Sequence, residues 1–237
     1  MLVWQSPRLG NHDIFYMTSN GTSWSDPKQI TTDPGSDKGP QVTQTKDDRV
    51  WVTWASRRNG DYKIFYKIYN GSSWSDDTQL TYDSTRSDST PSILQTIDDT
   101  IWIFWTSSTL TSDNDIFYVC SSDNGVTWSE SPIQFTTDAY EDMWSAITQA
   151  RDTKIWVAWT SNRGDQPDGN WDIYYKTSLA GDVNENGEVD VFDLSLVGTA
   201  YGSREGQPRY NIDADITRDG IVDLRDLAIV CFYYGET

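Results

Sequence analysis

Basic residues, histidine and cysteine are all scarce in this sequence of 237 residues. Lysine and arginine number 18 against 36 aspartates and glutamates, which gives a formal net charge of −18. Nucleic acids and anionic membrane surfaces are bound by clustered basic side chains, so we expect neither as a partner. The single histidine, His12, suggests no Ser-His-Asp or Cys-His catalytic set. We expect Cys120 and Cys231 to be two buried thiols, with a disulfide between them as the alternative.

Long apolar segments are also missing. No run approaches the ~18 residues that a membrane-spanning helix requires, so we expect no membrane span. The first residues, Met1 to Trp4, have the pattern of a strand rather than of a signal peptide. We therefore interpret the chain as a fragment or recombinant piece, whose export cannot be tested from its N-terminus. The acidic composition suits an extracellular or cell-surface protein.

Aromatic residues are abundant by contrast, and they recur with a period of about fifty residues, as in a repeat architecture. The tetrapeptide DIFY stands at 13–16 and 115–118, and close variants stand at 63–66 and 172–175. Each unit combines up to four short strand patterns, which is typical of β-propeller blades. We count units of three, four, four and three strands in residues 1–180, about three and a half blades.

An array of this size leaves strand edges unpaired, which is an aggregation liability. We therefore expect blades outside this chain, self-association through the propeller edges, or an irregular closure. The predicted fold is mainly β, a partial or self-associating propeller of four-stranded blades followed by a small all-α domain.

Turn sequences support the strand pattern. Asn20-Gly21 and Asn70-Gly71 each lie between two strand patterns, and we expect hairpins in which both turn positions have positive φ. The third unit carries a longer turn of the form S-x-D-x-G-x-x-W, from Ser121 to Trp128. This segment resembles the Asp-box (BNR) repeats of sialidase-like β-propellers. The resemblance implies that the carboxylate and the glycine hold a tight turn, with the tryptophan packed beneath it.

The composition changes at Ala180-Gly181, where oxygen-bearing side chains begin to follow calcium-loop spacing. Two segments of twelve residues, 182–193 and 215–226, carry such side chains at positions 1, 3, 5, 9 and 12 and a glycine at position 6. Calcium prefers six to eight hard oxygen ligands, one of them a main-chain carbonyl at position 7. The predicted ligands are Asp182, Asn184, Asn186, Glu188, Asp190 and Asp193 in the first loop and Asp215, Thr217, Asp219, Ile221, Asp223 and Asp226 in the second. We expect two calcium ions, the second held more weakly because Thr217 is a poor ligand.

An apolar pattern of helical spacing follows each loop, and a glycine that can cap the helix stands at Gly202 and Gly235. The repeated positions are Leu194, Val197 and Tyr201 in the first half and Leu227, Val230 and Tyr234 in the second. We also expect a short pairing between the loops through Val189 and Val222. An acidic solvated tail is the alternative interpretation.

The duplicated loop and helix of residues 181–237 resembles a dockerin. The resemblance implies an EF-hand-like, calcium-dependent domain that docks onto a cohesin-like scaffold protein. It places the partner contacts at loop positions 10 and 11 of each half, which are Val191, Phe192, Leu224 and Arg225. These are not the hydroxyl pair typical of cellulosomal dockerins, so a cellulosomal partner is in doubt.

Residues that break the propeller repeat are the candidates for ligand binding in residues 1–180. Trp144 and Trp171 lie outside the recurring positions, in loops that share one face of a propeller. With Tyr62 and Arg163, they are our candidate glycan-binding residues, and anchoring of the loops is the alternative role. Arginine also recurs four residues after a repeat tryptophan, which favours a structural ion pair. The arginines are Arg8, Arg58 and Arg163, and the candidate partners are Asp33, Asp83 and Asp138.

No catalytic residue is assigned, and enzyme activity is left undecided. The arginine motif of sialidases, R-I-P, is absent. We therefore favour a binding or assembly protein, in which the propeller binds a ligand such as a polysaccharide and the dockerin-like domain attaches it to a cohesin-type partner. The alternatives are a sialidase-like glycoside hydrolase with a dockerin, and a structural surface or adhesion protein that assembles through propeller edges.

Overall fold

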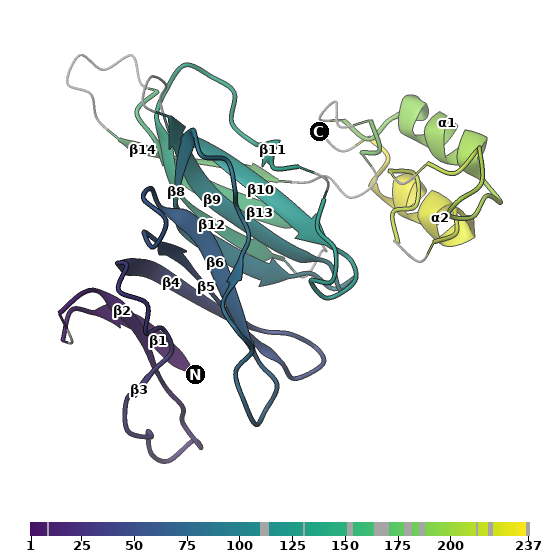
Figure 1. The fold of residues 1–237 in the computed structure, drawn as a ribbon. Coiled ribbons are helices and arrows are strands. Elements are labelled where there is room, and N and C mark those ends of the chain that lie inside the picture. The colour runs from purple at the N-terminus through teal and green to yellow at the C-terminus, as the bar shows by residue number, and fades with distance from the viewer. Residues whose placement is uncertain are drawn as a thin grey trace. The chain divides into compact units, whose positions relative to one another are not determined.

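The computed structural model describes residues 1–8, 10–109, 114–129, 131–150, 154–163, 171–177, 182–184, 188–211, 213–217 and 220–235. Contacts divide the chain into two compact units (Figure 1). The first contains Met1–Ile147 and Val157–Tyr175, and the second contains Thr148–Trp156 and Lys176–Thr237. The domain boundary predicted between residues 180 and 181 stays a prediction.

Fourteen strands form four small sheets in the described part of the chain (Figure 1). The first sheet has β1 (Leu2–Ser6), β2 (Asp13–Met17) and β3 (Lys28–Gln29). The second has β4 (Asp37–Gln44), β5 (Val50–Ser56), β6 (Lys63–Tyr69) and β7 (Thr78–Gln79). The third has β8 (Arg86–Gln95), β9 (Ile101–Thr109), β10 (Asp115–Ser121) and β11 (Ile133–Gln134), and the fourth has β12 (Asp142–Gln149), β13 (Ile155–Ser161) and β14 (Asp172–Thr177). The predicted units of three, four, four and three strands are confirmed.

A glutamine and a threonine close the outer edge of the first three sheets in the same way. Thr31 Oγ1 accepts a hydrogen bond from the Ile14 backbone N–H at 2.9 Å, and Gln29 Nε2 donates to the Thr31 carbonyl at 2.6 Å. The hydroxyl thus pairs a buried backbone N–H beyond the two-residue strand β3. The same hydroxyl contact joins Thr81 to Ile64 and Thr136 to Ile116.

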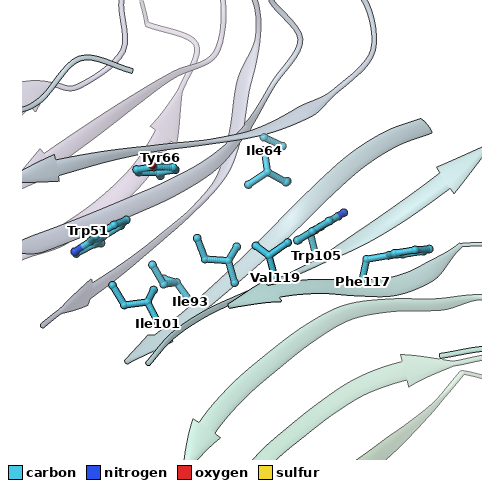
Figure 2. Close-up of a cluster of buried hydrophobic side chains, with 10 residues drawn as sticks. Trp51, Ile64, Tyr66, Ile93, Ile101, Trp105, Phe117 and Val119 are labelled. Carbon is cyan, nitrogen blue, oxygen red and sulfur yellow. The ribbon is translucent and has the colours of Figure 1, made fainter. Parts of the chain in front are cut away.

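Buried side chains pack between successive sheets. Alternate residues of a strand point to opposite faces, so the two faces of β5 serve different neighbours. Trp51 belongs to a buried cluster shared with the third sheet, drawn in Figure 2. Trp54 belongs to a cluster shared with Ile14 and Ile30 around the first sheet. Both tryptophans have no exposed surface, as expected for a strand enclosed between layers.

The Asn-Gly turns form hairpins, but with a different backbone from the one predicted. Only the glycines have positive φ, +92° at Gly21 and +95° at Gly71. The asparagine acts instead through its side chain, because Asn20 Oδ1 accepts hydrogen bonds from the backbone N–H of Thr22 at 3.0 Å and of Ser23 at 2.9 Å. The expectation of positive φ at both positions was therefore wrong, since the side chain replaces the backbone turn.

The turn from Ser121 to Trp128 has the geometry that the sequence predicts. Asp123 Oδ1 accepts the backbone N–H of Thr127 at 2.9 Å, and Ser121 Oγ accepts that of Gly125 at 2.8 Å. Hydrogen bonds to the carboxylate, first from the Thr127 side chain and backbone, lower the pKa of Asp123 to about 2. The Trp128 ring packs edge-on against Trp51, with ring centroids 6.3 Å apart.

Two helices form the C-terminal unit, α1 (Val191–Ala200) and α2 (Leu224–Tyr233). Each begins with an aspartate capping box, Asp190 with Asp193 and Asp223 with Asp226. Val197 and Val230 are fully buried, as predicted. Both predicted capping glycines follow their helices with positive φ, +76° at Gly202 and +88° at Gly235.

The two helix tyrosines do not pack as the helical spacing predicts. Tyr201 is 44% exposed and Tyr234 is 54% exposed. Each is the residue that ends its helix, with ψ of 133° and 124° respectively. Because the backbone has already left the helix there, the i+7 relation to the buried face no longer holds.

Backbone pairing connects the two halves of this unit crosswise. Val222 exchanges hydrogen bonds with the chain after α1, through Gly202 N–H to Val222 C=O at 2.8 Å and Val222 N–H to Ser203 C=O at 3.1 Å. The Gly235 N–H, after α2, donates to the Val189 carbonyl at 2.7 Å. Each loop therefore pairs with the segment after the opposite helix, and not with the other loop as we predicted.

Both cysteines were predicted to be buried, but neither is. Cys120 is half-buried in β10, and Cys231 is exposed on α2 because Val230 takes the buried position beside it. No helix among the described residues is long and apolar enough to cross a membrane.

Candidate functional site

The first candidate site is the pair of acidic loops that lead into α1 and α2. Asp193, at loop position 12, is fully buried. Its Oδ1 accepts the backbone N–H of Val183 at 2.8 Å and of Asn184 at 3.0 Å, and its Oδ2 accepts that of Asp190 at 2.8 Å. One carboxylate therefore holds the beginning and the end of the first loop together.

The second loop repeats this arrangement. Asp226 is fully buried, and it accepts the backbone N–H of Thr217 at 2.8 Å and of Asp223 at 2.8 Å. Asp215, at position 1, is also fully buried and accepts the N–H of Gly220 at 2.8 Å. The glycine at position 6 has φ of +81°, so the sharp turn that a calcium loop needs is present.

The chemistry of these side chains fits a hard cation. Asp193 and Asp226 are buried, and no lysine or arginine of the described chain pairs with either. Burying a carboxylate costs free energy unless a counter-charge or hydrogen bonds compensate it. Thr217 Oγ1, the predicted ligand at position 3, is buried and has no hydrogen-bond partner. An oxygen in that state is available to a metal ion.

The predicted metal ligands that the structure describes differ in burial. Within the described residues, no group of three or more His, Cys, Asp or Glu side chains lies close enough to hold a metal. Asp182 and Asn184 are half-buried, Glu188 is exposed, and Ile221, whose carbonyl was predicted to bind, is half-buried. Asn186 and Asp219 lie outside the described residues.

The four predicted docking residues lie at the surface, in the first turns of the two helices. Val191 is 57% exposed, Phe192 is 65% exposed and Leu224 is 66% exposed, and Arg225 is also exposed. Each pair follows directly after a capping aspartate, Asp190 or Asp223. Because Phe192 occupies the position that Arg225 holds in the other half, the two helix starts differ chemically.

The second candidate site is a pair of tryptophans at the fourth sheet. Trp144 lies within β12, and not in the preceding loop as predicted, whereas Trp171 directly precedes β14. Trp144 is 59% exposed and Trp171 is 42% exposed, and their ring centroids lie 6.3 Å apart. Trp144 has φ of +58°, in the left-handed region that large side chains rarely adopt. Gly39 and Thr90 also have positive φ, two residues after the buried Asp37 and Asp88, as Trp144 lies two residues after Asp142. A bulky, exposed side chain thus stands at a backbone position that favours glycine.

Arg163, the polar residue predicted beside the tryptophans, is committed to ion pairs. Its guanidinium lies 2.6 Å from Asp138 and 2.9 Å from Asp142, and it stacks 4.6 Å from the Tyr174 ring centroid. Burial raises the pKa of Asp115 above its usual value, and the negative charges of Asp142 and Asp138 also raise it. The predicted pairing of Arg163 with Asp138 is confirmed, and so is that of Arg58 with Asp33, at 4.0 Å.

Tyr62 belongs to another part of the propeller unit. It lies directly before β6 of the second sheet, half-buried against the cluster that contains Trp51. The Lys38 ammonium and the Arg57 guanidinium lie 5.9 and 6.0 Å from its ring centroid. The structure therefore brings together Trp144 and Trp171, whereas Tyr62 has a separate setting.

Sequence reasoning missed a buried aspartate at or near the start of β4, β8 and β12. Asp142 accepts a hydrogen bond from Trp159 Nε1 at 2.9 Å, and Asp88 accepts one from Trp105 Nε1 at 3.2 Å. Asp37 begins β4 in the same register and is fully buried. The spacing of four or five residues after Asp33, Asp83 and Asp138 was the available signal.

Comparison with known proteins separates the two parts of the chain. Residues 180–233 match the family described as Dockerin type I domain. No curated protein matches the chain.

The similar solved structures are β-propeller proteins. A GH93 alpha-L-arabinofuranosidase of Fusarium graminearum, in complex with arabinobiose, has a TM-score of 0.57 and 14% identity, over 74% of this chain and 58% of that enzyme. A protein of unknown function from Dyadobacter fermentans has a TM-score of 0.55 and 14% identity, over 71% and 55%. An endo-arabinase from Bacteroides thetaiotaomicron has a TM-score of 0.51 and 16% identity, over 74% and 70%. The chain thus spans little more than half the length of the first two.

At these identities the likeness extends to the fold alone. The chain therefore combines propeller repeats, which share the fold of these proteins, with a C-terminal segment similar to dockerin type I domains.

Proposed function

We propose that this protein is an extracellular assembly component, whose C-terminal unit docks onto a cohesin-like partner in a calcium-dependent manner. The observation that carries the proposal is the duplicated geometry of the two loops. In both halves, a fully buried aspartate joins the loop to its helix, and exposed residues follow in the first helical turn. Dockerin type I domains bind calcium, and the match over residues 180–233 supports the same requirement here.

Each loop would hold one calcium ion, and the ion would supply positive charge at the buried carboxylates. Asp193 and Asp226 would hold the helix starts against the loops. Thr217 would offer its unpartnered Oγ1 in the second loop. A neutral hydroxyl is a weaker calcium ligand than a carboxylate or an amide carbonyl, so the second loop would bind more weakly.

Calorimetric titration of the full chain with calcium, followed by chelation, tests this proposal. We expect two binding events, and far-UV circular dichroism should show loss of helical signal when the ion is removed. Asp193→Asn should abolish one event, because it removes a buried charge. Asp213→Asn is the matched control, since Asp213 is exposed and lies outside both loops. An unchanged spectrum and unchanged heat stability after chelation would rule the proposal out.

The docking surface is tested separately with immobilised type I cohesin domains. Phe192→Ala and Leu224→Ala should weaken binding without altering calcium uptake, since both side chains are largely exposed. Binding that persists in chelator would show that the contact does not need the ion.

A second candidate function is carbohydrate binding through Trp144 and Trp171. Two exposed indole rings in contact form a platform of the kind on which a sugar ring can pack. Replacing either with alanine should remove binding on an array of plant and microbial polysaccharides. Trp24→Ala is the control, because Trp24 is also largely exposed, at 54%, and lies between β2 and β3. If neither variant changes the array pattern, the tryptophan pair has only a structural role.

A further inference from the structure

Two hairpins of the propeller repeats carry a modification motif that the proposed function does not use. Asn20-Gly21-Thr22 and Asn70-Gly71-Ser72 have the form Asn-x-Ser/Thr, in which the middle residue is not proline. This is the sequence at which N-linked glycans are attached to exported proteins. Of the eleven asparagines in the sequence, only these two have a hydroxyl residue two positions later.

Both motifs lie at the tips of hairpins, one between β2 and β3 of the first sheet and the other between β6 and β7 of the second. Residues 20–23 and 70–73 are all exposed. An isolated bridge closes each turn. A bulky group on either asparagine therefore has room in the solvent around the tip of a short, closed turn.

The hydroxyl of each motif is bonded to the side chain that would be modified. Thr22 Oγ1 donates to Asn20 Oδ1 at 2.9 Å, and Ser72 Oγ donates to Asn70 Oδ1 at 2.8 Å. Each Oδ1 also accepts the backbone N–H groups two and three positions later, at 2.9–3.0 Å. All these contacts join residues at most three positions apart, so the turn does not depend on the rest of the fold.

These hydrogen bonds also decide which end of each amide faces outward. Since Oδ1 faces the backbone donors, Nδ2 takes the other position, and it donates no hydrogen bond to the part of the chain that the structure describes. A glycan on Nδ2 would therefore replace no existing contact. The modified amide keeps its oxygen, and with it the hydrogen bonds that hold the turn.

Two other Asn-Gly pairs of the propeller repeats lack the hydroxyl. The pairs that begin at Asn59 and Asn124 are followed by Asp61 and Val126. In the turn at Asn124, the side chain of Asp123 accepts the backbone N–H in place of the asparagine. The sequence thus contains Asn-Gly turns with and without the complete motif, and the second kind serves as an internal control.

We propose that Asn20 and Asn70 are acceptor sites for an N-linked glycan. The donor is a lipid-linked glycosyl diphosphate, and a transferase brings donor and acceptor together. A bond forms between the anomeric carbon of the sugar and Nδ2, the bond from that carbon to the diphosphate oxygen breaks, the diphosphate leaves with the electron pair, and one amide proton passes to a base. The hydrogen bonds to Oδ1 stabilise the negative charge that reaches this oxygen as the proton leaves. The proposal rests on the extracellular location proposed above, and not on docking or calcium binding.

Secretion of the full chain from a eukaryotic host that attaches N-linked glycans tests the proposal. Digestion with peptide-N-glycosidase in heavy-oxygen water converts each glycosylated asparagine into a labelled aspartate, which mass spectrometry of the peptides locates. We expect label at Asn20 and at Asn70. Thr22→Val should remove the glycan from Asn20 alone, because it removes the hydroxyl and keeps the shape of the side chain, whereas Thr22→Ser should retain it. Asn70 is the matched control within both variants.

The controls separate a glycan from spontaneous deamidation, to which Asn-Gly pairs are prone. Equal labelling of Asn20, Asn70, Asn59 and Asn124, or labelling without the digestion, would assign the signal to deamidation and overturn the proposal. Secreted protein without label at Asn20 and Asn70 would overturn it as well. The glycosylated chain should unfold at the same urea concentration as the chain made without glycans, since the turn loses no contact, and a lower midpoint would contradict the placement of the glycan on Nδ2. Cohesin binding is measured separately, so the two proposals can fail independently.

Discussion

Gly125 lies directly against a buried tryptophan of the neighbouring sheet, and its replacement by alanine should destabilise the first unit strongly. A Cβ at this position would lie 2.3 Å from Cη2 of Trp51. Trp51 has no exposed surface, so its ring has little room to move away. The backbone adds a second penalty, because φ at Gly125 is +81°.

The two penalties can be estimated separately. The left-handed conformation costs about 1–2 kcal/mol for a residue with a Cβ. Overpacking a close-packed core costs about 1–3 kcal/mol more. We therefore expect Gly125→Ala to lower the free energy of unfolding by about 2–5 kcal/mol. Gly71→Ala is the matched control, since Gly71 has φ of +95° but no atom within 4 Å of an added Cβ. Gly71→Ala should cost only the penalty for the left-handed backbone, about 1–2 kcal/mol.

Urea unfolding followed by tryptophan fluorescence measures the difference. All 12 tryptophans precede residue 172, so the signal reports on the propeller repeats. With a urea dependence of about 2 kcal/mol per molar, the packing term alone shifts the midpoint by a further ~0.5–1.5 M. Equal shifts in the two variants would refute the contact between this turn and the second sheet.

Three further changes test other parts of the structure. Hydrogen bonds lower the pKa of Asp123 from 3.8 to about 2, so the stabilisation that its carboxylate provides is present above pH 3.8 and is lost as the pH falls toward 2. At neutral pH, Asp123→Asn should therefore unfold at a lower urea concentration than the wild type. The difference between the two urea midpoints should disappear as the pH falls from 3.8 to 2. Arg163→Met leaves the fully buried Asp142 without its cation and should cost about 3 kcal/mol in urea unfolding, whereas Arg8→Met should cost about 1 kcal/mol or less. Trp144→Gly should leave the urea midpoint nearly unchanged. Relief of the positive φ gains about 1–2 kcal/mol and offsets the lost contact between the two rings, about 0.5–1.5 kcal/mol. A fall of several kcal/mol in the free energy of unfolding would show that the Trp144 ring anchors the fold.

Local repetition made much of the fold predictable from the sequence. The number of strands in each sheet, the turn built on Asp123 and the glycine caps of α1 and α2 all follow from short motifs that recur in register. The calcium loops were predicted in the same way, from the spacing of oxygen-bearing side chains before each helix. These features depend on neighbours within about twelve residues, the length of such a loop.

Features that depend on contacts between sheets were not predictable in the same way. Trp24 stands in register with Trp74 and Trp128, yet it is 54% exposed. Trp74 packs against Tyr16 of the first sheet, whereas no earlier sheet of the described chain covers Trp24. A repeat predicts what a residue can contact, but the neighbouring sheet decides whether the contact is made.

Backbone hydrogen bonds connect the first loop of the C-terminal unit to the segment after α2. Val189 is held by the N–H of Gly235, forty-six positions later, and Val222 is held by the turn after α1. Disturbing the segment after α2 would release the loop that contains Asp190, with no change in that loop itself. Because such coupling is reciprocal, binding that orders the first loop also stabilises α2. The two halves of the unit should therefore fold and unfold together.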